Sequence, residues 1–208
     1  MNRKWMREVR DWMDKGMCGL LPIYDDDGGN YTKLIFENDS PIIIKKRTNT
    51  ILVRLAAFFQ KDIRLIRAQA REVTGRRNMN PLPITQDIIL VPFKVRKPIG
   101  KDDGAVGYFY HRAIENIIEE KESVGIVLRD GQEYDILDTY PTAKHHIACA
   151  HQIYYHLLQR DLRSFNPYGL CQECAGVYNQ PATKADFVTL SRNLEELTCK
   201  LKKLQNKV

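Results

Sequence analysis

The sequence lacks any apolar run long enough to cross a membrane. A membrane-spanning helix needs roughly 20 consecutive apolar residues, whereas the longest runs here are of the order of residues 42–44 and 88–91. Residues 1–15 mix charged side chains with Trp5, Val9 and Trp12 and contain no apolar signal-peptide core. We therefore expect a protein that stays in the cytosol and has no membrane partner.

Cysteine is scarce too, with five residues at Cys18, Cys149, Cys171, Cys174 and Cys199. An odd number at irregular spacing argues against the disulfide framework of a secreted protein, so we expect reduced thiols. Cys171 and Cys174 have the spacing of zinc ligands, but a structural zinc ion needs four nitrogen or sulfur ligands and no second pair follows. The pair is a weak metal candidate, with plain loop cysteines as the alternative, and no cofactor is predicted.

The common catalytic motifs are missing as well. The chain has no P-loop, no Rossmann glycine fingerprint, no GxSxG and no HExxH. Asp25, Asp26 and Asp27 precede two glycines, a pattern more typical of a solvated turn than of a metal site. His145 and His146 fall near the start of a predicted helix, where we expect surface exposure. The sequence therefore predicts that the protein is not an enzyme. Of the function classes considered, a metal-dependent enzyme is the least favoured.

Positive charge is abundant, and it is concentrated in one segment. Residues 41–101 hold fourteen Lys and Arg against three acids, a net of +11 in a chain whose total is +6, so the remainder sums to −5. Such a polarised distribution favours contact with a polyanion. Within the segment Arg64, Arg67 and Arg71 recur at helical spacing, so a helix would present all three on one side to a row of phosphates.

The candidate DNA contacts share a basic side chain and a place in this segment. They are Lys45, Lys46, Arg47, Arg64, Arg67, Arg71, Arg76, Arg77, Lys94, Arg96 and Lys97. No zinc finger, RRM signature, KH loop or clear helix-turn-helix accompanies them. Two other interpretations remain open, namely a merely solvated basic face and a regulatory protein-binding module whose basic face meets an acidic partner.

Hydrophobic periodicity predicts an α+β fold of short antiparallel strands, hairpins and several helices. Thr48 or Thr50 is the expected N-cap of the second helix, and Asp130-Gly131 is a strong hairpin signal because Gly accepts a positive φ. Residues 114–120 are ambiguous between helix and strand. The expected helices are 2–15, 48–59, 62–73 and 142–162, and the expected strands are 20–24, 31–36, 41–45, 88–93, 107–111, 124–128 and 133–137.

The C-terminal part has a different character. Residues 163–182 read as a linker, and a narrow apolar seam with alternating spacings of three and four follows within residues 183–208. This seam predicts an association helix that pairs between chains, with packing on its own domain as the alternative. The predicted dimerisation residues are Phe187, Leu190, Leu194, Leu197, Leu201 and Leu204.

Several short motifs occur in a familiar order. Leu55-Ala56-Ala57-Phe58-Phe59 is followed by Arg67-Ala68, Glu72-Val73-Thr74 and Pro81-Leu82-Pro83-Ile84, then by the apolar strand at 87–93, the aromatic segment at 107–111 and Val127-Leu128-Arg129-Asp130-Gly131. From about residue 20 to 158 this order resembles the ComK family of bacterial competence transcription factors. Gln60 stands where that family usually has Gly, which predicts a more regular helix there, and the chain departs from the family altogether from Phe165 on.

The resemblance implies an activator that binds paired A/T-rich boxes of double-stranded DNA, mainly through the minor groove, as dimers that assemble on DNA. A proteolytic adaptor is a family partner, but the divergent C-terminal part does not carry that interaction over. Arg side chains suit the negative potential of narrow A-tract grooves, so both arguments agree. The expected organisation is an N-terminal amphipathic helix (1–18), a ComK-like DNA-binding domain (19–162), the linker and the association helix, in a cytoplasmic, nucleoid-associated bacterial regulator.

Overall fold

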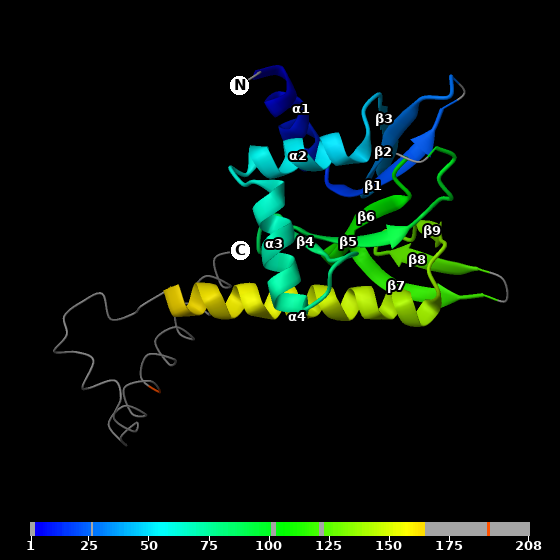
Figure 1. Ribbon diagram of the computed structural model, residues 1–208. Helices are drawn as coiled ribbons and strands as arrows, with labels where there is room; N and C mark the ends of the chain where they lie inside the picture. Colours follow the sequence, from blue (N-terminus) through cyan, green and yellow to red (C-terminus); the bar gives the residue numbers. More distant parts are fainter. Residues whose placement is uncertain (1–2, 26, 101–102, 121–122, 165–190, 192–208) are drawn as a thin grey trace, which may run out of the picture. The chain divides into compact units, whose positions relative to one another are not determined.

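The structure is a computed structural model that describes residues 3–25, 27–100, 103–120, 123–164 and 191. The chain divides into two compact units, Met1–Asp161 and Leu162–Val208, and nearly all described residues belong to the first (Figure 1). Apart from residues 163, 164 and 191, the predicted linker and association helix lie outside the described residues, as do Cys171, Cys174 and all six predicted dimerisation residues.

The larger sheet of the described residues has six antiparallel strands in the order β3-β2-β1-β6-β5-β4. The strands are β1 (Met17–Tyr24), β2 (Asn30–Phe36), β3 (Asp39–Ile44), β4 (Leu82–Pro83), β5 (Ile89–Lys94) and β6 (Val106–Tyr110). The hairpin expected around residues 25–30 is confirmed. β6 pairs with β1 through Gly19↔Phe109 and Leu20↔Tyr108, which brings the N-terminal hairpin beside the β5–β6 hairpin.

A smaller antiparallel sheet follows, with the order β7 (Ile114–Glu119), β8 (Val124–Leu128), β9 (Glu133–Ile136). The ambiguous segment at 114–120 is thus a strand, preceded by the short helix η1 (His111–Ala113). Gly131 has a φ of 82°, as the predicted Asp-Gly turn requires. The chain then enters the long helix α4 (Tyr140–Ser164), which runs along the opposite side of the unit from α1 (Arg3–Asp14) and α2 (Thr48–Phe58) in Figure 1.

One continuous apolar core joins the two sheets and the helices. The rings of Phe93 and Phe109 meet edge to face at 5.9 Å, and Phe109 also contacts Tyr134 of the smaller sheet at 5.5 Å. On the other side α1 (Arg3–Asp14) buries Val9 and Trp12, while α2 (Thr48–Phe58) packs on β1 and β2. The predicted α+β fold is therefore confirmed for the described residues.

The start of α2 corrects one sequence expectation. Neither Thr48 nor Thr50 caps the helix, because Arg47 occupies the N-cap with extended backbone and makes no side-chain cap bond. The Thr48 hydroxyl instead lies 3.2 Å from that of Thr32, and the Thr32 hydroxyl donates to the Lys46 carbonyl at 2.7 Å. Burial against β2 thus takes the hydroxyl that would otherwise cap the helix.

The end of α2 corrects another. The helix stops at Phe58 rather than continuing, and Gln60 adopts a φ of 57°, the left-handed conformation that glycine accepts most readily. The N–H groups of Gln60 and Lys61 bond back to the carbonyls of Ala57 and Ala56 at 3.0 and 2.9 Å, so the turn satisfies the last carbonyls of the helix. The replacement of glycine by Gln60 therefore does not make this segment more helical.

Candidate nucleic-acid interface

The helix α3 (Ile63–Thr74) carries the arginines with helical spacing, and its ends are fixed by local chemistry. The side chain of Asp62 accepts a hydrogen bond from the Arg64 N–H at 2.6 Å, which caps the N-terminus. At the other end Gly75 has a φ of 69° and its N–H bonds to the Arg71 carbonyl at 2.8 Å. Ile63, Ile66 and Ala70 are buried. Because one side of α3 is anchored in the core, the arginines point elsewhere.

The loop after α3 brings a further arginine to the same place. Asn80, only 9% exposed, donates from its side chain to the Arg76 carbonyl at 2.7 Å, and its side-chain oxygen accepts from the Thr74 hydroxyl at 2.7 Å. These bonds fold the loop back against the end of the helix. As a result Arg77, although exposed, lines the same depression as Arg71.

We name the depression that results the arginine hollow. Its volume is about 260 Å³, and it is lined by Arg67, Arg71, Arg77, Asn78, Met79, Asn80, Leu82, Pro92 and Tyr108. Pro92 of β5 and Tyr108 of β6 are register partners and supply part of the sheet floor. No carboxylate lines the hollow, and none of the ion pairs found among the described residues involves its three arginines. The hollow is therefore a cationic site without an internal counterion.

Two contacts position the inner arginine of the hollow. Nη2 of Arg67 donates to Oδ1 of Asn49 on α2 at 2.8 Å, so the guanidinium bridges two helices. Burial raises the pKa of Tyr108, and the neighbouring Arg67 guanidinium acts in the opposite direction. The phenol therefore stays protonated at neutral pH and adds a hydroxyl donor beside the guanidinium. A phosphate oxygen is the kind of acceptor that these groups would bind.

The other predicted contacts do not converge on this hollow. Arg64 is exposed on α3, one turn before Arg67, while Arg47 is exposed at the start of α2. Lys45 lies 3.6 Å from the Asp27 carboxylate, and together with Lys46 it lines a separate depression between α1, β3 and α2. Lys94, at the end of β5, and Lys97, in the loop after it, are exposed. The eleven predicted residues thus form several groups rather than one row.

Arg96 is occupied within the fold. Its guanidinium lies 3.9 Å from the centre of the Tyr24 ring, Nη2 donates to Asn30 at 2.6 Å and Nε donates to the Gly104 carbonyl at 2.8 Å. Burial lowers its pKa, although the group stays charged at neutral pH. These contacts tie the β5–β6 connection to the tip of the first hairpin. DNA contact by Arg96 would have to compete with them.

Arg76 turns inward, towards α4. Its Nη1 lies 3.5 Å from Nδ1 of His146 and donates to Sγ of Cys149 at 3.9 Å. His146 is 1% exposed, so the expected exposure of this histidine is wrong; its Nε2 has no partner and its ring meets Phe93 edge to face. Burial lowers the pKa of His146, Asp138 opposes this effect, and Arg76 adds to it. The imidazole is therefore neutral at physiological pH.

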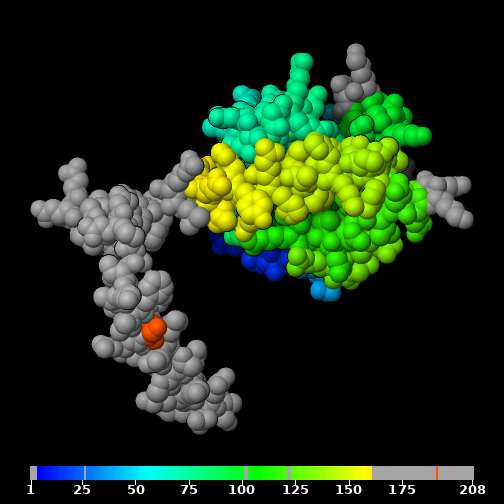
Figure 2. All heavy atoms as spheres, turned by 90° about the horizontal axis from the view of Figure 1, so that it is seen from below, coloured from blue at the N-terminus to red at the C-terminus, as the bar shows by residue number. Residues whose placement is uncertain are grey.

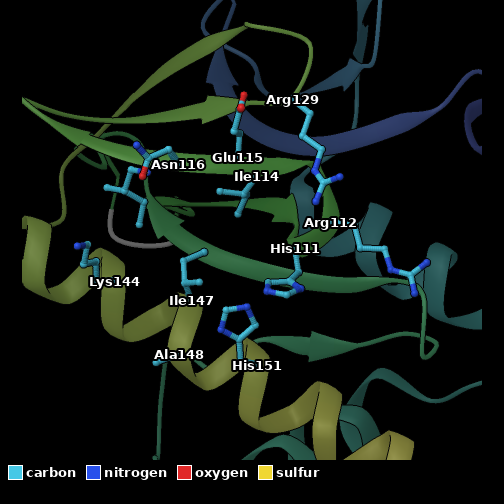
Figure 3. Close-up of a pocket in the computed structure, with 11 residues that line it drawn as sticks. His111, Arg112, Ile114, Glu115, Asn116, Arg129, Lys144, Ile147, Ala148 and His151 are labelled. Carbon is cyan, nitrogen blue, oxygen red and sulfur yellow. The ribbon is translucent and has the colours of Figure 1, made fainter.

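A second cationic feature, which no sequence pattern indicated, is a cavity of about 420 Å³ between β7 and α4 (Figure 3). Arg112, Arg129 and Lys144 line it, and the rings of His111 and His151 meet across it at 4.6 Å. These residues are far apart in the sequence and show no shared periodicity. Figure 3 shows Ile147 and His151 rising from α4 towards β7. Only the packing of α4 beside the small sheet brings the residues together.

Neither metal binding nor membrane insertion gains a structural basis from the described residues. No group of three or more His, Cys, Asp or Glu side chains is arranged there to hold a metal ion. Asp27 accepts hydrogen bonds from the Gly29 N–H at 2.8 Å and the Tyr31 hydroxyl at 2.9 Å, which are contacts of a turn. None of the described helices is long and apolar enough to span a membrane. The pair Cys171 and Cys174 stays a prediction.

Comparisons with protein-family models, with curated proteins and with solved structures found no match to this chain.

Proposed function

We propose that this protein is a sequence-selective DNA-binding transcription regulator that recognises A/T-rich boxes, largely through the minor groove. The observation that carries the proposal is the arginine hollow, where Arg67, Arg71 and Arg77 converge without a carboxylate. Three guanidinium groups without a carboxylate partner repel one another. A polyanion relieves that repulsion and releases its own counterions on binding. The resemblance to the ComK family supports the same function and suggests an activator.

The geometry also supports the choice of groove. The arginines line a depression of about 260 Å³, so each would reach DNA as a single side chain. This differs from a recognition helix, which enters the major groove as a whole. Arginine side chains inserted singly are favoured in narrow A/T-rich minor grooves, where the negative potential is deepest. Arg64 and Arg47, both exposed on neighbouring elements, would then contact the flanking phosphates.

The proposal includes self-association. Paired boxes require two DNA-binding units, and the heptad seam in the sequence from Phe187 to Leu204 is the element that would hold two chains together. Action on DNA places the protein with the bacterial nucleoid in the cytoplasm. The family resemblance alone suggests a proteolytic adaptor as a further partner, and the divergent C-terminal part does not carry over the segment that the family uses for it.

One gel-shift experiment tests the proposal. The full chain is mixed with duplexes of equal length that are either A/T-rich or G/C-rich, at several salt concentrations, with and without a minor-groove ligand such as netropsin. We expect preferential binding of the A/T-rich duplex and displacement by the ligand. Equal binding of both duplexes, unaffected by the ligand, would reject sequence-selective minor-groove recognition. Binding to neither duplex would favour the alternative, a regulatory module that meets an acidic protein.

A further inference from the structure

The cavity beside α4 continues into a second one, and together they form what we call the α4 groove. The first cavity measures about 420 Å³ and the second about 260 Å³, and both are lined by His111, Arg112 and His151. One side of α4 supplies Lys144, Ile147, Ala148, His151 and Tyr155, which recur at helical spacings of three and four. In Figure 2 α4 crosses this face as a ridge, with the green strands along one side.

The opposite wall of the groove is the edge of a sheet. Ile114, Glu115, Asn116 and Ile117 all line it, although successive side chains of a strand point to opposite faces. Four consecutive residues can share a groove when it runs along the strand's backbone edge. β7 pairs with β8 alone in the three-stranded sheet. Among the described residues, no backbone hydrogen bond outside the regular elements joins β7 to α4. This edge is therefore open to another strand.

One backbone donor of β7 already has a substitute partner. The N–H of Ile117 donates to Oδ1 of Asn116, the side chain next to it, at 2.9 Å. The amide oxygen of Asn116 thus occupies a position where the carbonyl of an incoming strand could serve equally well. Asn116 is exposed and is free to turn away when a partner arrives.

The charges indicate what kind of strand fits. Arg112 is paired with Asp87 at 2.7 Å. The other charged side chains that line the first cavity are Arg129, Lys144, whose ammonium also lies 4.5 Å from the centre of the Tyr140 ring, and Glu115. The side chains of Arg129 and Lys144 are both exposed. Between them lie Ile114 and Ile147, both partly buried. This arrangement favours a segment in which carboxylates alternate with apolar side chains.

We infer that the α4 groove binds an extended acidic segment of a partner protein, which adds a strand to the free edge of β7. The stretch of α4 from Lys144 to Tyr155 is about 16 Å long at 1.5 Å per residue, so roughly five residues of an extended chain span it. Strand addition takes affinity from main-chain hydrogen bonds and specificity from alternate side chains. A DNA duplex is too wide to enter a groove of this size, so the inference is independent of the arginine hollow and of DNA binding.

The test uses the full chain and an array of immobilised synthetic peptides of about eight residues. One set alternates Glu with Val, Ile or Tyr, a second replaces Glu by Lys, and a third repeats the acidic set with an N-methylated backbone at every residue, so that neither edge of the peptide can donate. We expect binding to the acidic set only, because N-methylation removes the donors that a strand must supply. Equal binding of the N-methylated set, or binding no better than the lysine set, would overturn the inference.

The peptide that binds most tightly is then labelled, and its affinity for variants of the protein is measured by fluorescence anisotropy to locate the binding site. Arg129→Glu with Lys144→Glu should weaken binding about tenfold or more, whereas Arg71→Glu with Arg77→Glu, the matched charge reversal at the arginine hollow, should change it less than about twofold. Ala148→Glu, at an exposed position of α4 in the groove, provides a second block that adds a charge without removing a contact. All variants are first compared by thermal unfolding.

Two competitors distinguish other occupants. Inorganic phosphate and a single-stranded oligonucleotide of matched charge should displace the peptide only weakly, since neither offers a strand edge. If the oligonucleotide binds more tightly than the peptide and is lost in the same Arg129 and Lys144 variant, the groove binds nucleic acid and the inference is wrong. Equal losses in the two charge-reversal variants would also overturn it, because binding would then follow net charge.

Discussion

Replacing Arg67, Arg71 and Arg77 together with alanine removes every charged side chain that lines the arginine hollow. The change leaves its apolar and backbone floor in place, since Leu82, Pro92 and Tyr108 belong to the sheet. Arg67 also bonds to Asn49 on α2, so a double variant at Arg71 and Arg77 alone separates the loss of charge from the loss of that contact.

The expected effect is a change in salt dependence as much as in affinity. Each phosphate contact contributes about 0.9 to the slope of log K against log salt, so three lost contacts reduce the slope by about 2.7. Between about 50 and about 200 mM salt the affinity of the triple variant should then fall about 40-fold less than that of the wild type. The double variant should lose about 1.8 from the slope.

Fluorescence anisotropy on A/T-rich and G/C-rich duplexes across a salt series measures both quantities. The matched control removes three cations from the α4 groove, by changing Arg112, Arg129 and Lys144 to alanine. It should keep the wild-type slope on DNA. If the hollow variant retains the wild-type slope and affinity, the arginine hollow does not contact DNA. If the control loses as much as the hollow variant, net charge rather than position explains the binding, and the hollow has no special role.

Three further predictions follow from individual positions. Gln60→Gly should stabilise the fold by about 0.5 to 1 kcal/mol in urea unfolding because it relieves a left-handed φ of 57°, whereas Gly75→Ala, at a φ of 69°, should destabilise it by a similar amount. Burial lowers the pKa of His146, so below about pH 6.5 the histidine binds a proton in the unfolded chain but not in the folded one. The free energy of unfolding should therefore fall as the pH drops, by at most about 1.4 kcal/mol per pH unit. His146→Phe should flatten this pH dependence. Leu194→Asp with Leu197→Asp should give a folded monomer in sedimentation with weaker binding to paired boxes, and a retained wild-type mass with lower thermal stability would instead show that the seam packs within one chain.

Local signals predicted most of the described elements. Asp-Gly at residues 130–131 specified a hairpin because glycine accepts a positive φ, and β-branched apolar runs specified β2, β3 and β5. The helix expected at 62–73 agrees with α3, whose ends the structure shows at Asp62 and Gly75. Predictions from local sequence were wrong where burial or a tertiary turn changed the role of a residue. The hydroxyl of Thr48 bonds within the core instead of capping α2, and Gln60 takes a glycine conformation because the chain must turn into α3.

The candidate site shows the same division. Helical spacing alone placed Arg67 and Arg71 on one side of α3, but the sequence held no reason for Arg77 to join them while Arg76 turned inward. That separation depends on the bonds of Asn80 to the loop and on the contact between the end of α3 and α4.

Interactions among neighbouring residues set most of the helices, strands and turns, so the sequence alone predicted these together with the concentration of positive charge; the strand at 114–119 and the two ends of α2 were exceptions. The tertiary structure alone decided which charges are free. It buried His146, tied Arg96 to the first hairpin and assembled the α4 groove from Arg129 and Lys144. Such outcomes depend on pairings between distant segments, above all β1 with β6 and α4 with the small sheet, which no local pattern encodes.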